Sequence, residues 1–212
     1  PTVCTFDVTP TADGNVTVDI AADSMDDPAG NGNSTATQFA IVSDTQAPAA
    51  APITAATSPA SPTSDTGADL NITCGTESAN GTVVVTTNPA NGFSPNYATT
   101  ENLDANGDLT LSAITWNAGT YDIVLACSDE AGNGPTAPAS NPSVTIDSGA
   151  PTATITSTET GPTNADPIPF TVTFSEAMDE GTITLSDFIV SNGTASNLNC
   201  SGDPTGCTLD VT

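Results

Sequence analysis

The two ends of this chain have nearly the same sequence. Residues 1–9 read Pro-Thr-Val-Cys-Thr-Phe-Asp-Val-Thr and residues 204–212 read Pro-Thr-Gly-Cys-Thr-Leu-Asp-Val-Thr, so seven of nine positions are identical. Both stretches alternate apolar and polar residues, which is typical of a half-buried strand. We interpret the match as one period of a tandem repeat plus the first strand of the next copy, and expect neither terminus to be natural. A chance match is the alternative, which the shared cysteine and Pro-Thr start disfavour.

The charge of the chain excludes several classes of function. It has no Lys, Arg or His against 25 Asp and Glu, a net charge of −25. Nothing cationic is present to contact a phosphate, so we expect no binding to nucleic acid and no direct binding to anionic membranes. A Ser-His-Asp site is impossible, and the Asp179-Glu180 pair lacks a surrounding aromatic cluster, so we expect no enzyme. The uncompensated charge favours bound divalent cations or saline surroundings.

Short alternating runs fill the chain, and no run has apolar residues at helical spacing. In the first part we expect strands at Val3–Thr9, at residues 16–20 and at Gln38–Val42, too few and too one-sided for a domain. The last part has alternating residues at 153–155, 170–174 and 183–190, followed by two strands facing each other across residues 201–206. Joined through the shared strand, residues 151–212 and 1–44 would form one domain of ordinary size.

The middle of the chain is long enough for a complete β-sandwich. Alternating runs end at Cys74 and Cys127, with Asn80-Gly81 as a hairpin signal between them. One cysteine on an early strand and one on a late strand is the placement of the cross-sheet disulfide in immunoglobulin-like sandwiches. We therefore predict an all-β fold of tandem immunoglobulin-like sandwiches. Its parts are the C-terminal half of a domain at 1–47, a complete domain at 48–147 and the N-terminal half of the next domain at 148–212.

The five cysteines lack the Cys-x-x-Cys spacing of a metal site, which favours disulfides and an oxidising exterior. We predict the pairs Cys74–Cys127 and Cys200–Cys207, the second closing a hairpin. Cys4 corresponds to Cys207 in the repeat. It should therefore pair with the counterpart of Cys200 in a preceding copy and be unpaired in this chain.

Several motifs carry a resemblance to a known family. They are Pro-Thr-Asn at 162–164, Phe-Thr-Val-Thr-Phe-Ser-Glu at 170–176, Asn-Gly-Thr-Ala at 192–195, Asp-Pro-Ala-Gly-Asn at 27–31, Asp-Thr-Gln-Ala-Pro at 44–48, Gly-Thr-Tyr at 119–121 and Asp-Glu-Ala-Gly-Asn at 129–133. With these, the chain resembles the bacterial Ig-like tandem repeats of giant extracellular adhesins and biofilm-associated proteins. The resemblance implies a secreted, calcium-stiffened rod at the cell surface. The cysteines and the missing cations depart from that family.

Calcium is the expected cofactor, because Ca²⁺ takes several oxygens from carboxylates, amides and carbonyls. We expect one ion near Asp129, Glu130 or Asn133 with Asp147, and an equivalent one near Asp27 or Asn31 with Asp44, joined by Glu176. The alternative is that these side chains only shape turns. The full set of candidate ligands is Asp129, Glu130, Asn133, Asp147, Asp26, Asp27, Asn31, Asp44, Glu176, Asp104, Asn106 and Asp108.

The leading interpretation is a structural segment of an extracellular fibre, stalk or adhesin shaft, whose partners are its own tandem or filament neighbours. One alternative is a filament of separate subunits, in which each half-domain is completed by a neighbour. A second is a ligand-binding adhesin module, which would need a pocket or an aromatic platform. Glycans are possible at Asn-x-Ser/Thr sequences, although composition alone would produce them. These begin at Asn15, Asn33, Asn71, Asn80 and Asn192.

Overall fold

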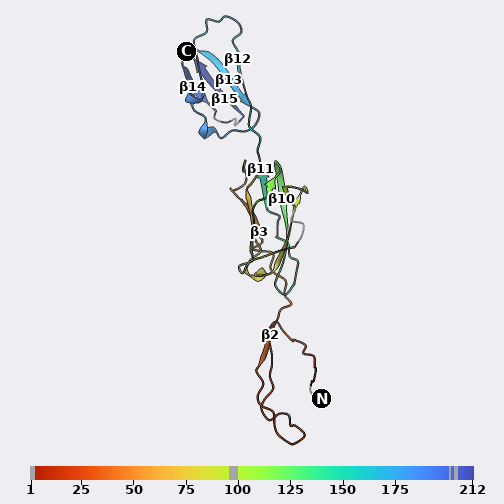
Figure 1. Cartoon of the computed structure of the whole chain (residues 1–212). Coiled ribbons are helices and arrows are strands. Elements are labelled where there is room, and N and C mark those ends of the chain that lie inside the picture. The colour runs from red at the N-terminus through yellow and green to blue at the C-terminus, as the bar shows by residue number, and fades with distance from the viewer. Residues whose placement is uncertain (1–2, 96–99, 201, 203–204) are drawn as a thin grey trace. The chain divides into compact units, whose positions relative to one another are not determined.

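The computed structural model describes residues 3–95, 100–200, 202 and 205–212. Within them the regular structure is β-strand, with three single-turn 3₁₀ helices, and the strands pair antiparallel. The predicted all-β class is confirmed. The chain divides into two compact units, Pro1–Ser148 and Gly149–Thr212, which are described separately below (Figure 1). The outer residues of the terminal repeat, 1–2 and 204, lie outside the described part.

The first unit begins with an isolated hairpin of β1 (Gly14–Val18) and β2 (Phe39–Ser43). The register pairs Val16 with Ile41 and Val18 with Phe39, so four apolar side chains share one face. The predicted strand Val3–Thr9 is not formed, and these residues are exposed and have no regular secondary structure. A strand needs a neighbour for its backbone hydrogen bonds. The neighbours of the matching C-terminal strand, β15 (Gly206–Val211), belong to the second unit.

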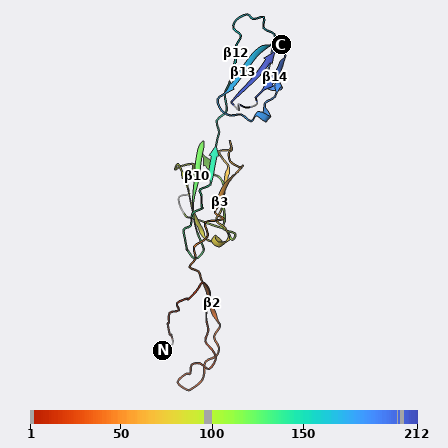
Figure 2. The same ribbon diagram turned by 180° about the vertical axis from the view of Figure 1, so that it is seen from behind.

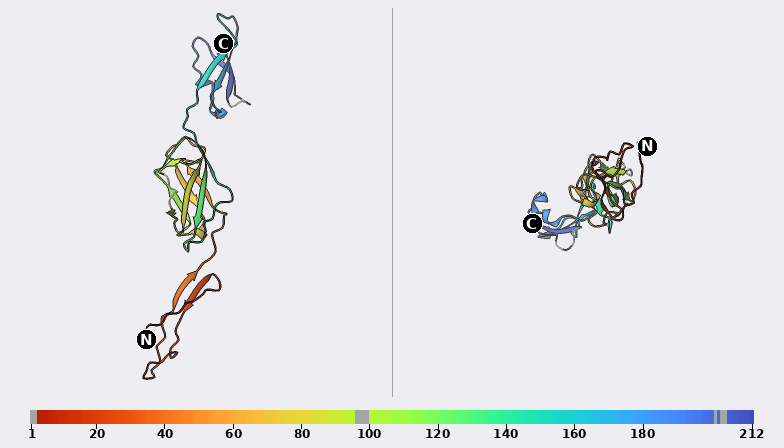
Figure 3. Two further views of the ribbon diagram at one scale, coloured as in Figure 1. Left: turned by 90° about the vertical axis from the view of Figure 1, so that its right-hand side faces the viewer. Right: turned by 90° about the horizontal axis from the view of Figure 1, so that it is seen from below.

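The rest of the first unit is a sandwich whose strands lie in two layers (Figure 3). One sheet has the order β3-β4-β8 and the other the order β11-β10-β5-β7, and a short pair, β6-β9, completes the fold. This is the strand order of an immunoglobulin-like sandwich, with its two inner faces forming one core. The strands are β3 (Thr54–Ser58), β4 (Asp69–Thr73), β5 (Thr82–Asn88), β6 (Phe93–Ser94), β7 (Thr100–Asn102), β8 (Asp108–Leu111), β9 (Thr115–Trp116), β10 (Gly119–Ser128) and β11 (Ser143–Ile146).

Period-two alternation determines which side chains enter the sandwich core. Leu70, Ile72 and Cys74 are buried while Asn71 between them is exposed, and Ile123, Leu125 and Cys127 are buried from the opposite sheet. Cys74 and Cys127 form a disulfide of 2.01 Å between the two sheets, which confirms that pairing. The core also encloses Trp116, whose indole Nε1–H donates to the Ala68 carbonyl at 2.8 Å.

The connection at Asn80-Gly81 is not a hairpin, contrary to the sequence prediction. It follows the 3₁₀ helix η1 (Thr76–Ser78) and carries the chain from β4 in one sheet to β5 in the other. A Cβ at Gly81 would lie 2.1 Å from the Ser128 carbonyl oxygen. The glycine is therefore needed because two backbone segments approach closely, rather than because two neighbouring strands reverse direction.

The second unit is a single sheet of order β12-β13-β15-β14, seen from behind in Figure 2. Its strands are β12 (Ala153–Ser157), β13 (Ile168–Phe174), β14 (Ala195–Asn199) and β15, and the predicted Cys200–Cys207 disulfide joins the last two. Residues 183–190 do not form the predicted strands. One 3₁₀ helix, η2 (Glu180–Thr182), ends just before them, and a second, η3 (Leu185–Asp187), lies among them. Side-chain capping by Asp179, Thr184 and Asp187 favours the helical turns over the alternating pattern.

Candidate functional site

Three of the predicted acidic clusters are the same backbone turn. They lie at residues 27–31, 104–108 and 129–133, and each starts with Asp and has Gly in fourth place. In each, the first N–H donates to the fifth carbonyl and the glycine N–H donates back to the first carbonyl, at 2.9 to 3.2 Å. The glycine φ values are +84° at Gly30, +78° at Gly107 and +87° at Gly132. One turn type has therefore been used three times, with glycine in the left-handed position.

The first carboxylate of each turn accepts backbone N–H groups. Asp27 Oδ1 accepts from Ala29 at 2.8 Å and from Asn31 at 2.9 Å, while its Oδ2 accepts from the Asn31 amide. The Asn31 side chain, followed by the Asn31 backbone N–H, lowers the pKa of Asp27. At Asp104, the backbone N–H of Asp108 is the largest cause of a lowered pKa. These carboxylates stabilise the turns that contain them.

The predicted partnership of Asp129, Glu130 and Asn133 with Asp147 is wrong. Strands β10 and β11 are antiparallel with Gly119 opposite Ile146, so Asp147 lies beside the start of β10. Asp129 follows the end of that ten-residue strand. The two sites are therefore roughly 30 Å apart, at about 3.3 Å per residue.

The predicted partnership of Asp26, Asp27 and Asn31 with Asp44 fails for the same reason. The turn at residues 27–31 lies in the loop between β1 and β2, whereas Asp44 follows β2 at the open end of the hairpin. There the Thr45 N–H donates to Asp13 Oδ1 at 3.0 Å. The two groups of candidate ligands occupy opposite ends of one hairpin, so a single ion cannot bridge them.

The structure instead brings the 129–133 turn to the Asp44 backbone. The Asn133 amide Nδ2 donates to the Asp44 carbonyl at 3.1 Å and to Asp129 Oδ2 at 2.9 Å. Asp129 is buried, while Glu130 is exposed. Within the described residues no three acidic or cysteine side chains gather closely enough to hold a metal ion. Glu176 follows β13 in the second unit, and its role across a junction stays a prediction.

The turn at 104–108 differs from the other two in one respect. Asp108 Oδ1 is buried without a hydrogen-bond partner, whereas Asp104 Oδ1 accepts from both Asn106 and Asp108. A buried, unpaired carboxylate oxygen is costly and is a group that a cation can satisfy. In all three turns an asparagine amide donates to the first carboxylate, so Asp108 Oδ1 is the feature by which Asp104, Asn106 and Asp108 fit a calcium ion better than the other turns.

Aromatic residues in the described part of the sandwich are directed inward. Phe93, Trp116 and Tyr121 are all buried, with the Phe93 and Trp116 rings 4.9 Å apart in an edge-on arrangement. They provide no exposed platform on which a sugar could stack. Among the glycan acceptor sequences, Asn33 uses its amide within its own loop, donating to the Ala21 and Ser34 carbonyls. Asn15, Asn71, Asn80 and Asn192 are exposed.

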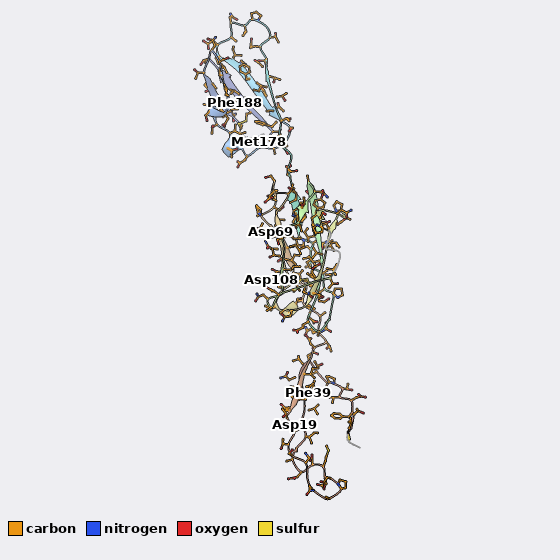
Figure 4. All side chains as sticks on the ribbon, viewed as in Figure 1. Asp19, Phe39, Asp69, Asp108, Met178 and Phe188 are labelled. Atoms are coloured by element: carbon orange, nitrogen blue, oxygen red, sulfur yellow. A yellow bond between two sulfur atoms is a disulfide. The ribbon has the colours of Figure 1, made fainter. Side chains whose placement is uncertain are left out.

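The exposed features of most interest are two open apolar faces. On the β1–β2 hairpin, Val16, Val18, Phe39 and Ile41 line a shallow groove together with Val8. On the second unit, a groove is lined by Ile155, Val172 and Phe174 together with Met178 and Phe188. Figure 4 labels the last two side chains. Sheets ordinarily cover such a face with a second layer.

Residues 147–212 match the family described as bacterial Ig-like domain. This is a non-catalytic domain typical of surface proteins, and no enzyme family matched. No curated protein and no solved structure matches the chain. A bacterial Ig-like domain together with two disulfides indicates an extracytoplasmic protein. No helix in the described part of the chain is long and apolar enough to span a bilayer.

Proposed function

We propose that this chain is a structural repeat segment of an extracellular fibre, stalk or adhesin shaft built from tandem Ig-like sandwiches. The observation that carries the proposal is the sequence match between residues 3–9 and 206–212. The later copy is the inner strand β15 of a sheet, whereas residues 3–9 of the earlier copy form no strand. A repeat in which each copy supplies part of the next domain accounts for both facts.

The surface chemistry supports the same proposal. A chain with 25 carboxylates and no cation repels copies of itself unless salt or divalent ions screen the charge. The two disulfides persist outside the reducing cytoplasm. Both properties fit a fibre in a saline, oxidising exterior.

The mass of the native protein tests the continuous-chain form of the proposal. After reduction and denaturation, material recognised by an antibody to the middle sandwich should migrate far above the 21.0 kDa of this chain. Immunogold labelling of intact cells with the same antibody should mark fibres outside the cell. A band near 21.0 kDa would instead support the alternative, a filament of separate subunits.

We also propose that calcium stiffens this fibre. The unpaired Asp108 Oδ1 supports a site at 104–108. At the 129–133 turn, Asp129 Oδ2 and the Asp44 carbonyl already accept from the Asn133 amide, so an ion there would have to displace that amide. When bound, Ca²⁺ would supply positive charge that the chain itself lacks. Calorimetric titration with CaCl₂ should show binding that Asp108→Asn weakens, with Asp69→Asn on the neighbouring strand β4 as a control. Unchanged thermal stability and fibre stiffness after chelation would leave these loops as turns only.

A further inference from the structure

The β1–β2 hairpin has an apolar face that the described residues of the first unit cover only in part, with Val8 and Pro10 beside it. Phe39 is 63% and Ile41 58% exposed, and the buried core of this unit begins only at Ile53. Val42, the next residue on β2, also lines the groove and is 67% exposed. A two-stranded hairpin is at best marginally stable alone in water, so this one needs a second layer.

The sheet of the second unit is open in the same way. Its buried residues are Val172, Cys207 and Leu209, and half-buried apolar side chains surround them. Ile155, opposite Val172 on β12, is 62% exposed. A further groove on this face is lined by Phe170, Phe188 and Ile189. The short helices η2 and η3 therefore leave much of the face exposed.

The sequence match indicates which segment of the repeat could cover this sheet. Residues 3–9 are a copy of β15, and the chain continues from them into β1 and β2. In the repeat, the strand that matches residues 3–9 is β15, which lies within the open sheet. The counterparts of β1 and β2 would therefore follow β15 in sequence. Among the described residues of its own unit the hairpin pairs with no further strand, and the sheet of the second unit contains no counterpart of β1 and β2.

We propose that the apolar face of the β1–β2 hairpin packs on the open face of β12-β13-β15-β14 of a second copy of this chain, the two together forming one closed sandwich. The facing residues are aliphatic and aromatic, as in the inner layers of a sandwich. This proposal rests on the proposed function and deepens it, because it identifies a second copy of the chain as the partner of each face. The interface is heterologous, so copies associate head to tail and not as symmetric pairs.

Sedimentation equilibrium of the full chain tests the proposal, with substitutions matched by face. The wild-type chain should form oligomers that lengthen with concentration. Ile41→Asp and Ile155→Asp should each lower the association constant by about 100-fold or more, since an unpaired carboxylate would be buried. Ala40→Asp and Thr154→Asp, next to them on the outward faces, should leave it within about threefold. All four positions are exposed in the single chain, so folding should be preserved.

Mixing the two defective variants makes the test specific. Ile41→Asp keeps an intact sheet face and Ile155→Asp keeps an intact hairpin, so their mixture should form dimers and nothing longer. Association should strengthen from 50 mM to 1 M salt, because both partners are acidic. A wild-type chain that stays monomeric at all concentrations, or an Ile155→Asp variant that dimerises alone, would overturn the proposal. Either result would leave surface labelling of the fibre, the test of the proposed function, unaffected.

Discussion

The middle sandwich and the second unit are built from the same kind of strand, yet only one of them has a closed core. Both have alternating apolar residues, an antiparallel sheet and a disulfide. In the described part of the chain, eighteen buried apolar residues form the core of the sandwich, and three form that of the second unit. Alternation makes a strand two-faced, but a side chain is removed from water only when a second layer covers it.

The largest expected difference between the two regions comes from truncating one isoleucine in each. Ile123→Ala, at a position with 0% exposure, should destabilise the sandwich by about 2–5 kcal/mol through lost burial and a cavity. Ile155→Ala, at 62% exposure, should change the stability of the second unit by about 0.5 kcal/mol or less. Denaturant unfolding followed by Trp116 fluorescence reports on the sandwich, and hydrogen exchange reports on the second unit.

The same measurements on a longer chain test whether the missing second layer causes this difference. In a tandem chain in which Thr212 of one copy is followed by Pro10 of the next, the sheet containing Ile155 should be covered. There Ile155→Ala should cost about as much as Ile123→Ala does. An equal cost in the single chain would mean that the second unit is already closed.

Removing the disulfides should give the next largest effects. The bond between Cys74 and Cys127 spans 53 residues of sequence and that between Cys200 and Cys207 spans 7. Constraint of the unfolded chain predicts losses of about 4 and about 2.5 kcal/mol respectively when each pair is replaced by alanine. Chemical denaturation of the two double variants tests the order. A larger loss at Cys200–Cys207 would show that this bond substitutes for the missing core of the second unit.

Glycine substitutions compare two copies of the acidic turn. Gly107→Ala places a Cβ 2.0 Å from the Gly75 carbonyl oxygen at φ +78°, whereas Gly132→Ala at φ +87° meets nothing within 4 Å. The second change should cost about 1 kcal/mol from the left-handed backbone alone, and the first should cost more because atoms overlap. Thermal unfolding of both variants gives the comparison. Equal losses would mean that the loop at 104–108 moves freely away from Gly75.

The smallest expected effect is a pH dependence from the same turns. The pKa of Asp104 is lowered in the folded chain by the Asp108 N–H, so its carboxylate contributes stability above its ordinary value of 3.8. That contribution is lost as pH falls through the lower folded pKa. Asp104→Asn should therefore lower the unfolding temperature at pH 6, and the gap to wild type should close near pH 2. A gap that does not depend on pH would contradict this role.

The sequence determined the features of this protein that depend on neighbouring residues. Period-two alternation located β4, β10 and β13, because successive side chains of a strand point to opposite faces of the sheet. The Cys74–Cys127 and Cys200–Cys207 pairs followed from the strands on which the cysteines lie. The composition excluded sites that need a cationic side chain.

Tertiary structure alone decided which strand ends meet. The sequence placed Asp129 near Asp147, yet the antiparallel register separates them by the length of β10 and brings Asn133 to Asp44. It also expected Val3–Thr9 and residues 183–190 to be strands, but pairing partners and capping side chains decided otherwise. The physical reason is that alternation is a local property of two adjacent residues. Register, partner strands and the covering of a face depend on contacts between residues far apart in the chain.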